Sequence, residues 1–268
     1  MRIGKWNFDT KENTYIMGIL NVTPDSFSDG GKYNSIDTAL KRVEQMLAEG
    51  MDILDIGGES TRPGYTKISD QEEIERVIPV LEAVKSRFDI PVSIDTYKSK
   101  VAESAILAKA DLINDIWGLK ADLNMAQVIA KHQVACCLMH NRVNGQYDDF
   151  LQDMKADIGE SILLAKQANI MEDKIMIDPG VGFAKDYTQN LLAIRHLAQL
   201  KELGYPILLG TSRKSVIGLT LDLPKEERLE GTLVTTVMAV QQGCGFVRVH
   251  DIKANYRAIR MARAILGV

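Results

Sequence analysis

The sequence predicts an α/β protein, a single (β/α)8 TIM barrel over residues 1–268 that begins with a short β-hairpin. Short β-branched, apolar runs alternate eight times with stretches of helical period, which is the pattern of strands joined by helices. The length of 268 residues suits such a barrel, and no linker or low-complexity tract marks a second domain. An open doubly wound sheet would show the same alternation, but the count of eight favours the barrel.

The predicted elements follow one another regularly along the chain. Residues 3–8 and the turn-rich residues 9–13 are expected to form a hairpin that closes the N-terminal end of the barrel. The strands are expected at 15–20, 51–56, 91–94, 111–113, 134–139, 174–177, 205–209 and 246–249. The helices are expected near 36–47, 74–84, 98–108, 122–132, 151–169, 187–202, 225–242 and 253–266.

The first two helices show the basis of these assignments. Apolar residues of 36–47 recur at three- and four-residue spacing and give one apolar face. Ser69 followed by Glu72 is a capping-box pattern, so the second helix is expected to begin there. Pro79 lies inside that helix and is expected to bend it. The long loops 22–34 and 59–69, rich in Gly, Pro, Asp and Ser, are expected to act as lids over the barrel mouth.

The composition excludes several classes of function. The chain has 32 Lys and Arg against 36 Asp and Glu, a net charge of −4, which gives no electrostatic reason to bind nucleic acid. No apolar run approaches the roughly 20 residues of a membrane span, and the first nine residues do not resemble a secretory signal. The three cysteines do not suit a disulfide framework, and no His/Cys cluster suits zinc. The expected location is a reducing cytoplasm.

Chemically capable side chains stand where each predicted strand ends, and in a barrel these ends form the active site. One such residue is often only the N-cap of the next helix, but eight of these ends on one rim favour a catalytic site. The residues at these ends include Asn21, Asp55, Glu59, Asp95, Thr96, Asn114, Asp115, Met139, His140, Asn141, Asp178, Thr211, Ser212, Arg213, Lys214, Arg248, His250 and Asp251.

The ends of the seventh and eighth strands predict an anion-binding site. Ser212, Arg213 and Lys214 follow the seventh strand, and Arg248 and His250 end the eighth. Barrels frequently bind phosphate at this place through backbone N–H groups and a helix N-terminus, and these side chains add cationic donors. We therefore expect an anionic, phosphorylated substrate.

The opposite side of the rim offers hydrogen-bond acceptors. Asp95, Asn114 and Asp178 end the third, fourth and sixth strands. Buried carboxylates need donating partners, and an aminopyrimidinone edge, an amino sugar or a metal ion would each satisfy them. The residue types alone do not choose among these ligands.

Two long motifs and several short ones resemble the dihydropteroate synthase family. The first is MGILNVTPDSFSDGG at 17–31, and the second is DIGGESTRPG at 55–64. Shorter matches follow in the family's order, namely SIDT at 93–96, ND at 114–115, MH at 139–140, DPGVGF at 178–183, SRK at 212–214 and RVHD at 248–251. The resemblance runs from about residue 15 to 253 and so covers nearly the whole chain.

The resemblance implies a pterin-binding barrel and a transferase reaction. The family condenses 6-hydroxymethyl-7,8-dihydropterin diphosphate with 4-aminobenzoate, giving 7,8-dihydropteroate and diphosphate in folate biosynthesis. It also implies Mg2+ as cofactor, in contact with Asn21 beside the diphosphate. The implied partners are these small molecules and a second copy of the chain in a homodimer, with no nucleic acid and no membrane.

The resemblance further assigns roles to individual residues. The pterin slot would be lined by Asp95, Asn114, Met139, Asp178 and Lys214. The diphosphate would be held by Arg248 and His250, and the aminobenzoate site would be framed by Thr61, Arg62, Pro63, Phe183 and Ser212. The catalytic roles would fall to Asp95, Lys214 and Arg248.

Two other functions fit part of the pattern. Pterin-dependent methyltransferases share the barrel and part of the pterin slot but need no diphosphate site, so residues 61–63 and 212–214 argue against them. A pterin-binding protein without catalysis is disfavoured by the intact set of Asn21, Asp95, Lys214 and Arg248. Diphosphate release in the presence of both substrates separates the three functions.

Overall fold

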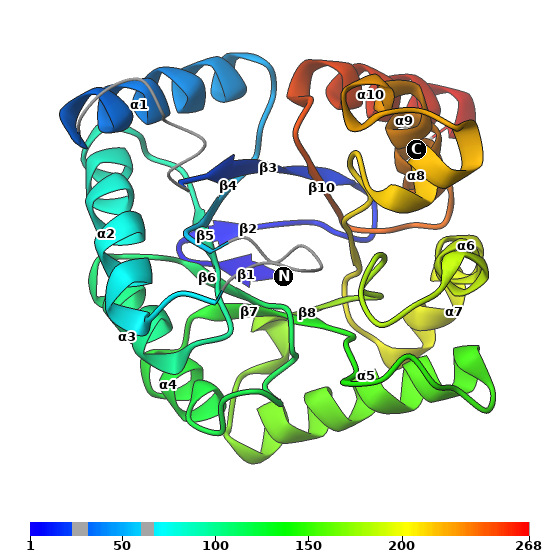
Figure 1. Cartoon of the computed structure of the whole chain (residues 1–268), viewed down its shortest axis with the longest axis horizontal. Helices are drawn as coiled ribbons and strands as arrows, with labels where there is room; N and C mark the ends of the chain where they lie inside the picture. Colours follow the sequence, from blue (N-terminus) through cyan, green and yellow to red (C-terminus); the bar gives the residue numbers. More distant parts are fainter. Residues whose placement is uncertain (23–31, 60–66, 268) are drawn as a thin grey trace.

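The computed structural model describes residues 1–22, 32–59 and 67–267, and in these ranges eight parallel strands form a barrel (Figure 1). The strands lie in the order β8-β7-β6-β5-β4-β3-β10-β9. A parallel bridge between Ile177 and Ile207 joins the two edge strands and closes the ring, so the predicted barrel is confirmed. The strands are β3 (Tyr15–Asn21), β4 (Ile53–Gly57), β5 (Val92–Asp95), β6 (Leu112–Asp115), β7 (Ala135–Met139), β8 (Ile175–Asp178), β9 (Leu208–Leu209) and β10 (Phe246–Val249).

Helices surround the barrel on the outside, as Figure 1 shows. Each predicted helix has a counterpart, and each predicted strand ends within three residues of the observed one. Among the helices that the structure describes, none is long and apolar enough to cross a membrane. The helices are α1 (Lys32–Ala48), α2 (Asp70–Arg87), α3 (Ser99–Leu107), α4 (Met125–His132), α5 (Phe150–Gln167), α6 (Tyr187–Arg195), α7 (Leu197–Leu200), α8 (Ser215–Leu221), α9 (Leu229–Gln241) and α10 (Ile252–Leu266).

Three helix predictions differ from the structure. The helix expected at 187–202 is interrupted at His196, whose φ of −113° and ψ of 26° separate α6 from α7. The helix expected from 225 begins as a 3-10 turn, and α9 starts only at Leu229. Sequence analysis missed α8, because seven residues are too few to show a helical period and no side chain caps its first turn.

Helix α2 begins where its capping residue predicts. The Oγ of Ser69 accepts a hydrogen bond of 3.1 Å from the N–H of Glu72. The Glu72 carboxylate pairs with Arg76 instead of returning to the backbone of Ser69, so half of the predicted capping box forms. The helix continues through Pro79 to Arg87 without a break in its assignment.

Side chains alternate along each strand between the surrounding helices and the barrel interior. Outward residues such as Leu54 and Ile94 pack under the helices in the larger apolar cluster. The hairpin of β1 (Arg2–Ile3) and β2 (Trp6–Asn7) closes the N-terminal end of the barrel, as predicted. The inner apolar cluster that it completes consists of Ile3, Phe8, Met17, Ile53, Leu112, Ala135, Cys137, Met176, Leu208 and Phe246.

Candidate active site

Polar side chains fill the barrel interior at the C-terminal ends of the strands. On a barrel strand, the residue two positions after an inward apolar residue such as Ile53, Leu112 or Phe246 faces the same side. Asp95 joins this layer because it pairs in register with Asn114. The interior therefore changes from apolar at the hairpin to polar at the mouth, where it presents Asp55, Asn114, Met139, Asp178 and Arg248.

Arg248 lies in this layer and bridges two buried carboxylates. Its Nε is 2.6 Å from Asp55 Oδ2, and its Nη2 is 2.7 Å from Asp95 Oδ2. Burial raises the pKa of the Asp95 carboxyl to about 7; Arg248 acts against this shift, and the charge of Asp55 adds to it. Arg248 thus shares one positive charge between two buried carboxylates of the layer.

Asp178 presents one oriented acceptor to the mouth. Its Oδ1 accepts a hydrogen bond of 2.6 Å from the N–H of Gly180. Gly180 has a φ of +67°, and a Cβ there would lie 1.9 Å from the His140 carbonyl oxygen, so only glycine fits. The other carboxylate oxygen of Asp178, Oδ2, lies beside Gly210 and accepts no hydrogen bond from the residues that the structure describes. Burial raises the pKa of Asp178, while Lys214 opposes the shift.

Lys214 places an ammonium group next to Asp178. Its Nζ donates to the carbonyl oxygen of Val181 and lies 4.9 Å from the centre of the Phe183 ring. Burial lowers the pKa of Lys214 to about 8, although the charge of Asp178 acts in the opposite direction. The ammonium is thus held at the mouth with a proton that is easier to lose than that of an exposed lysine.

Ser212 and His250 form a neutral donor pair at the ends of β9 and β10. The backbone N–H of His250 donates to Ser212 Oγ at 3.2 Å, and the same Oγ lies 2.9 Å from His250 Nδ1. The Ser212 hydroxyl can accept from the backbone N–H and donate its own proton to Nδ1, and in that tautomer the ring proton of His250 is on Nε2. Burial, followed by the charge of Arg248, lowers the pKa of His250 to about 3, so the imidazole is neutral at pH 7.

Arg213, which lies between these groups in the sequence, is engaged elsewhere. Its Nε and Nη2 lie 2.9 and 2.6 Å from the two carboxylate oxygens of Asp251. A guanidinium held by both oxygens of one carboxylate is fixed in place. Lys214 is therefore the cationic side chain of this segment that remains at the mouth.

The side-chain oxygens of Asn21 and Asp95 are ligands of the kind that suits a magnesium ion bound together with phosphates. Asn21 pairs with Gly57, and its Oδ1 and the Oδ2 of Asp95 both lie within 4 Å of where a Gly57 Cβ would stand. Mg2+ prefers oxygen ligands and usually takes only one or two from the protein, with water and substrate phosphates as the rest. Among the residues that the structure describes, no three His, Cys, Asp or Glu side chains form a cluster that could hold a metal alone.

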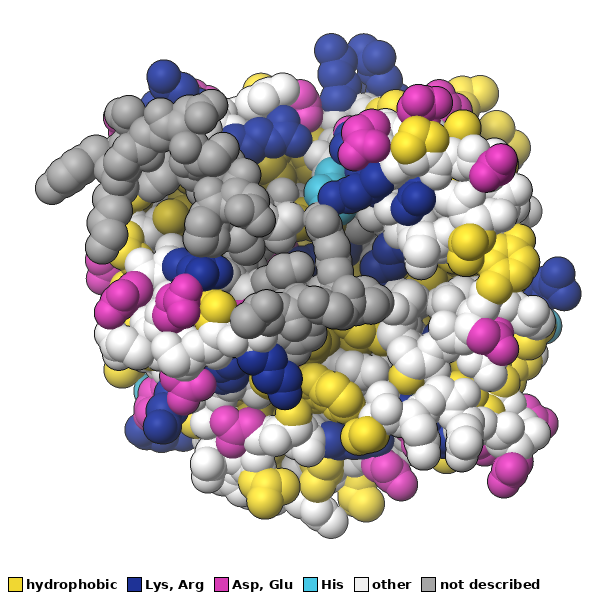
Figure 2. Space-filling model, in the orientation of Figure 1, with side chains coloured by type: hydrophobic (Ala, Val, Ile, Leu, Met, Phe, Trp, Pro, Cys, Tyr) yellow, Lys and Arg dark blue, Asp and Glu magenta, His cyan; other side chains and the backbone are white. Residues whose placement is uncertain are grey.

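Basic side chains surround the mouth on the face shown in Figure 2. A groove of about 460 Å³ opens there between the loops that follow β5, β6 and β7, with Tyr97, Trp117 and Asn141 on its walls. Lys67, Lys120 and Arg142 also line it. Asp157 lines the groove as well and pairs with Arg142, and Lys120 pairs with Glu160, so these two charges are offset by carboxylates.

The structure brings most of the predicted site residues to one end of the barrel. Thr61, Arg62 and Pro63 lie outside the described residues. Sequence analysis gave no role to Asp55, although its position two residues after the inward Ile53 places it in the same layer as Asp178. The predicted residues that surround the mouth are Asn21, Asp95, Asn114, Met139, Asp178, Phe183, Ser212, Lys214, Arg248 and His250.

Comparison with known proteins agrees with this arrangement. A family model described as pterin binding enzyme matches residues 17–250. The dihydropteroate synthase of Clostridium beijerinckii is 59% identical over 267 residues, with 99% of each chain covered. That of Bacillus subtilis is 53% identical, with 96% of this chain and 90% of the relative covered.

Solved structures are similar over the same length. The dihydropteroate synthase of Clostridium difficile, crystallised in the presence of pteroic acid, has a TM-score of 0.94 at 51% identity, covering 97% of this chain and 99% of that one. The enzyme of Xanthomonas albilineans with 4-aminobenzoic acid has a TM-score of 0.91 at 39% identity, covering 96% and 94%.

The barrel, its polar mouth and the family match define a pterin-binding enzyme of the TIM-barrel class. Such a barrel carries its chemistry on the loops after the strands, where the residues described above lie. Within this class the chain belongs to the dihydropteroate synthase family, whose members are transferases.

Proposed function

We propose that the barrel mouth joins 4-aminobenzoate to 6-hydroxymethyl-7,8-dihydropterin diphosphate, forming 7,8-dihydropteroate and releasing diphosphate. The composition of the mouth carries this proposal, because acceptors on Asp95, Asn114 and Asp178 lie together there with the cationic Lys214 and Arg248. An aminopyrimidinone edge donates hydrogen bonds and a diphosphate accepts them, so the mouth offers matching partners to both parts of the substrate. Relatives crystallised with pteroic acid and with 4-aminobenzoic acid support these substrate classes.

Asp178 would recognise the pterin by its ring N–H and its amino group. The bond from Gly180 fixes the plane of the Asp178 carboxylate and leaves Oδ2 directed to the ligand. Asn114 and Lys214 would contact the remaining polar atoms of the ring, and the buried Met139 would pack against its face. A carboxylate that faces both of these donors distinguishes a pterin from rings that lack the amino group.

Arg248 and His250 would stabilise the diphosphate as the carbon–oxygen bond breaks. Arg248 contributes a fixed positive charge, and the neutral His250 donates its Nε2–H, so both act where negative charge develops. The methylene cation that remains is stabilised by the electron-rich dihydropterin and by the carboxylate form of Asp95. Phe183 and Ser212, with Thr61, Arg62 and Pro63 as sequence-based partners, would frame the aminobenzoate.

The amine of 4-aminobenzoate then forms the carbon–nitrogen bond and loses one proton. An aromatic amine is a weak base and is unprotonated at pH 7, so its lone pair is free without a dedicated base. This chemistry explains how the mouth can work with charged and hydrogen-bonding groups and without a nucleophile activated by a triad.

We further propose that Mg2+ accompanies the diphosphate and contacts Asn21. When bound, Mg2+ would neutralise phosphate oxygens and so improve the leaving group. The Asn21 amide oxygen beside Asp95 supports this assignment, because it is a neutral oxygen ligand at the edge of the presumed phosphate position.

Replacing Asn21 by alanine is expected to lower Mg2+-dependent turnover about tenfold or more, as loss of a metal contact typically does. A pterin without diphosphate should bind as it does to the wild type, because it carries no metal. Isothermal titration measures the affinity for the pterin diphosphate with Mg2+ and the affinity for the pterin without diphosphate. The control is Asn124→Ala, which removes an amide at the start of α4. An equal loss of affinity for both ligands would contradict the metal assignment.

Release of diphosphate from both substrates together tests the proposed reaction. We expect stoichiometric diphosphate and dihydropteroate, with no product when 4-aminobenzoate is left out. Methyl transfer to a corrinoid or thiol would instead identify a pterin-dependent methyltransferase. Pterin binding without either product would identify a protein that only binds pterins.

We also propose that two copies of the chain form a homodimer in a reducing cytoplasm. Helices α9 and α10 pack together and expose Val234, Val237, Met261 and Ile265, which supports a protein contact on this face. The cysteines are free and buried, as a reducing compartment would leave them. The molecular mass in solution tests the dimer.

A further inference from the structure

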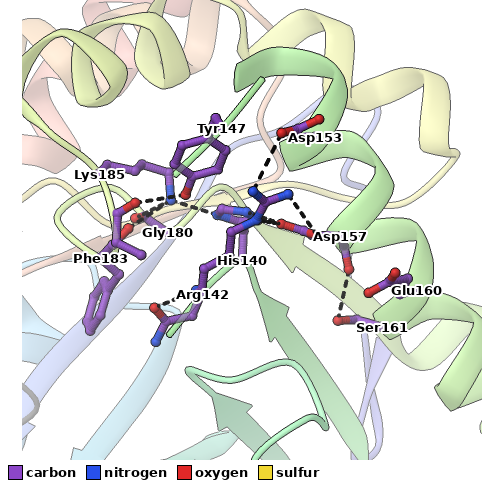
Figure 3. Close-up of polar contacts among 12 residues, drawn as sticks. His140, Arg142, Tyr147, Asp153, Asp157, Glu160, Ser161, Gly180, Phe183 and Lys185 are labelled. Carbon is purple, nitrogen blue, oxygen red and sulfur yellow. Dashed lines mark hydrogen bonds and ion pairs between the residues drawn. The ribbon is translucent and has the colours of Figure 1, made fainter. Parts of the chain in front are cut away.

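Lys185 lies in the loop between β8 and α6, and three acceptors enclose its ammonium group (Figure 3). Its Nζ lies 3.0 Å from the carbonyl oxygens of both Gly180 and Phe183 and 2.7 Å from His140 Nδ1. Three acceptors match the three N–H donors of a charged lysine. The loop at 180–183 is therefore folded around a single ammonium group.

A chain of polar groups from α5 orients this ammonium. His140 Nε2 lies 2.9 Å from Asp157 Oδ2, and Arg142 Nε holds the same carboxylate oxygen at 2.5 Å (Figure 3). An ammonium only donates and a carboxylate only accepts, so the His140 ring carries its proton on Nε2. Burial, with the charge of Lys185 next, lowers the pKa of His140 to about 3, which keeps the ring neutral. His140 therefore offers Lys185 a fixed acceptor.

This chain of polar groups reaches the mouth through the backbone of the loop at 180–183. The Gly180 carbonyl accepts from Lys185, while the Gly180 N–H donates to Asp178 Oδ1. The Phe183 carbonyl accepts from Lys185 as well, while the Phe183 ring lies 4.9 Å from Lys214 Nζ. In Figure 3 the Phe183 ring extends away from the Lys185 side chain. Lys185 thus holds the backbone of the loop at both Gly180 and Phe183.

Other groups do not replace these contacts. Tyr147 donates to the carbonyl oxygen of Ala184 at 2.8 Å, which tethers the loop one residue beyond Phe183. Nothing else among the described residues donates a hydrogen bond to the Gly180 carbonyl besides Lys185 and the local turn to Phe183. Removing the ammonium therefore leaves the Gly180 carbonyl with only the turn hydrogen bond from Phe183 among the described residues, one residue's backbone angles away from the N–H that orients the Asp178 carboxylate.

We propose that Lys185 is a positioning residue that holds Asp178 and Phe183 for substrate through the carbonyl groups of Gly180 and Phe183, with His140 and Asp157 orienting it. The inference rests on the proposed function, because that function places the pterin on Asp178 and the aminobenzoate beside Phe183. Lys185 itself contacts neither substrate in this arrangement. Its effect is expected in substrate affinity and in the correct placement of the reacting groups.

Lys185→Met tests this role, since it keeps the length of the side chain and removes the donors. We expect affinity for a pterin without diphosphate to fall about tenfold or more, as for the loss of a buried hydrogen-bonding group, while inorganic diphosphate binds as in the wild type. The control is Lys174→Met, because Lys174 donates to the Gln133 carbonyl at the opposite end of β8. That variant should bind the pterin normally.

A double-mutant cycle with Asp178→Asn separates positioning from general stability. If Lys185 acts through Asp178, then Lys185→Met should weaken pterin binding much less in the Asp178→Asn background than in the wild type. A purely structural lysine would instead weaken pterin and diphosphate binding together, with independent effects in the cycle. Circular dichroism confirms that each variant is folded, and Lys185→Gln, with a neutral amide, replaces Lys185→Met if the latter unfolds.

The outcomes also distinguish this inference from the proposed function. If the wild type binds no pterin and releases no diphosphate, the proposed function is wrong. If the wild type does both, and a folded Lys185 variant keeps wild-type pterin affinity and wild-type KM values, the positioning role is wrong. Selective loss of pterin affinity with strong coupling to Asp178 supports the role.

Discussion

Arg248→Met is expected to reduce kcat/KM by about a factor of 10² to 10³ and to destabilise the folded protein by about 3–5 kcal/mol. The loss of activity follows because Arg248 is the fixed charge at the proposed leaving group. The loss of stability follows because Asp55 and Asp95 would face each other in the barrel interior without their shared guanidinium. Steady-state kinetics and urea unfolding measure the two effects.

Two further variants separate these effects. Adding Asp55→Asn to Arg248→Met removes one unpaired charge, so stability should recover in part while activity stays low. Arg87→Met breaks an exposed ion pair with Glu44 and should change the free energy of unfolding by less than about 1 kcal/mol. Near-normal turnover by Arg248→Met would show that the diphosphate is neutralised by other groups.

Asp178→Asn is expected to weaken pterin binding by about 2–4 kcal/mol with little change in shape. The substitution replaces one acceptor oxygen by an NH2 group, which would face either the donors of the pterin or the N–H of Gly180. Calorimetric titration with a pterin that lacks diphosphate isolates this interaction from the phosphate contacts. Normal affinity in the variant would show that Asp178 only shapes the turn at Gly180.

Asp115→Asn is the matched control for this experiment. Asp115 is also a buried carboxylate at a strand end, and it accepts from the N–H groups of Trp117 and Leu119 at 2.9 and 2.7 Å. Its neighbour in register is Leu138, which belongs to the larger apolar cluster under the helices, so Asp115 faces away from the mouth. The variant should lose stability, by about 1–3 kcal/mol, and keep its affinity for the pterin.

The barrel could be predicted because its signals are local. Eight apolar runs of three to six residues predicted the strands, and the spacing of apolar residues predicted the helices between them. Helix α8 carries no such signal, because it spans only two turns, and the break at His196 depends on backbone angles that no pattern in the sequence shows. The elements that were missed are the short ones that packing defines.

The sequence by itself determined the order of the elements and the set of polar residues at the strand ends, because strand periodicity and motif order are properties of neighbouring residues. Only the tertiary structure decided which of those residues act together. Arg248 reaches Asp55 and Asp95, which lie 193 and 153 positions away, because closing the barrel turns β10, β4 and β5 toward one interior. Arg213 takes Asp251 instead and leaves the mouth to Lys214. Partner choice depends on distances across the barrel and on the cost of burying charge, and neither quantity is a property of a short stretch of sequence.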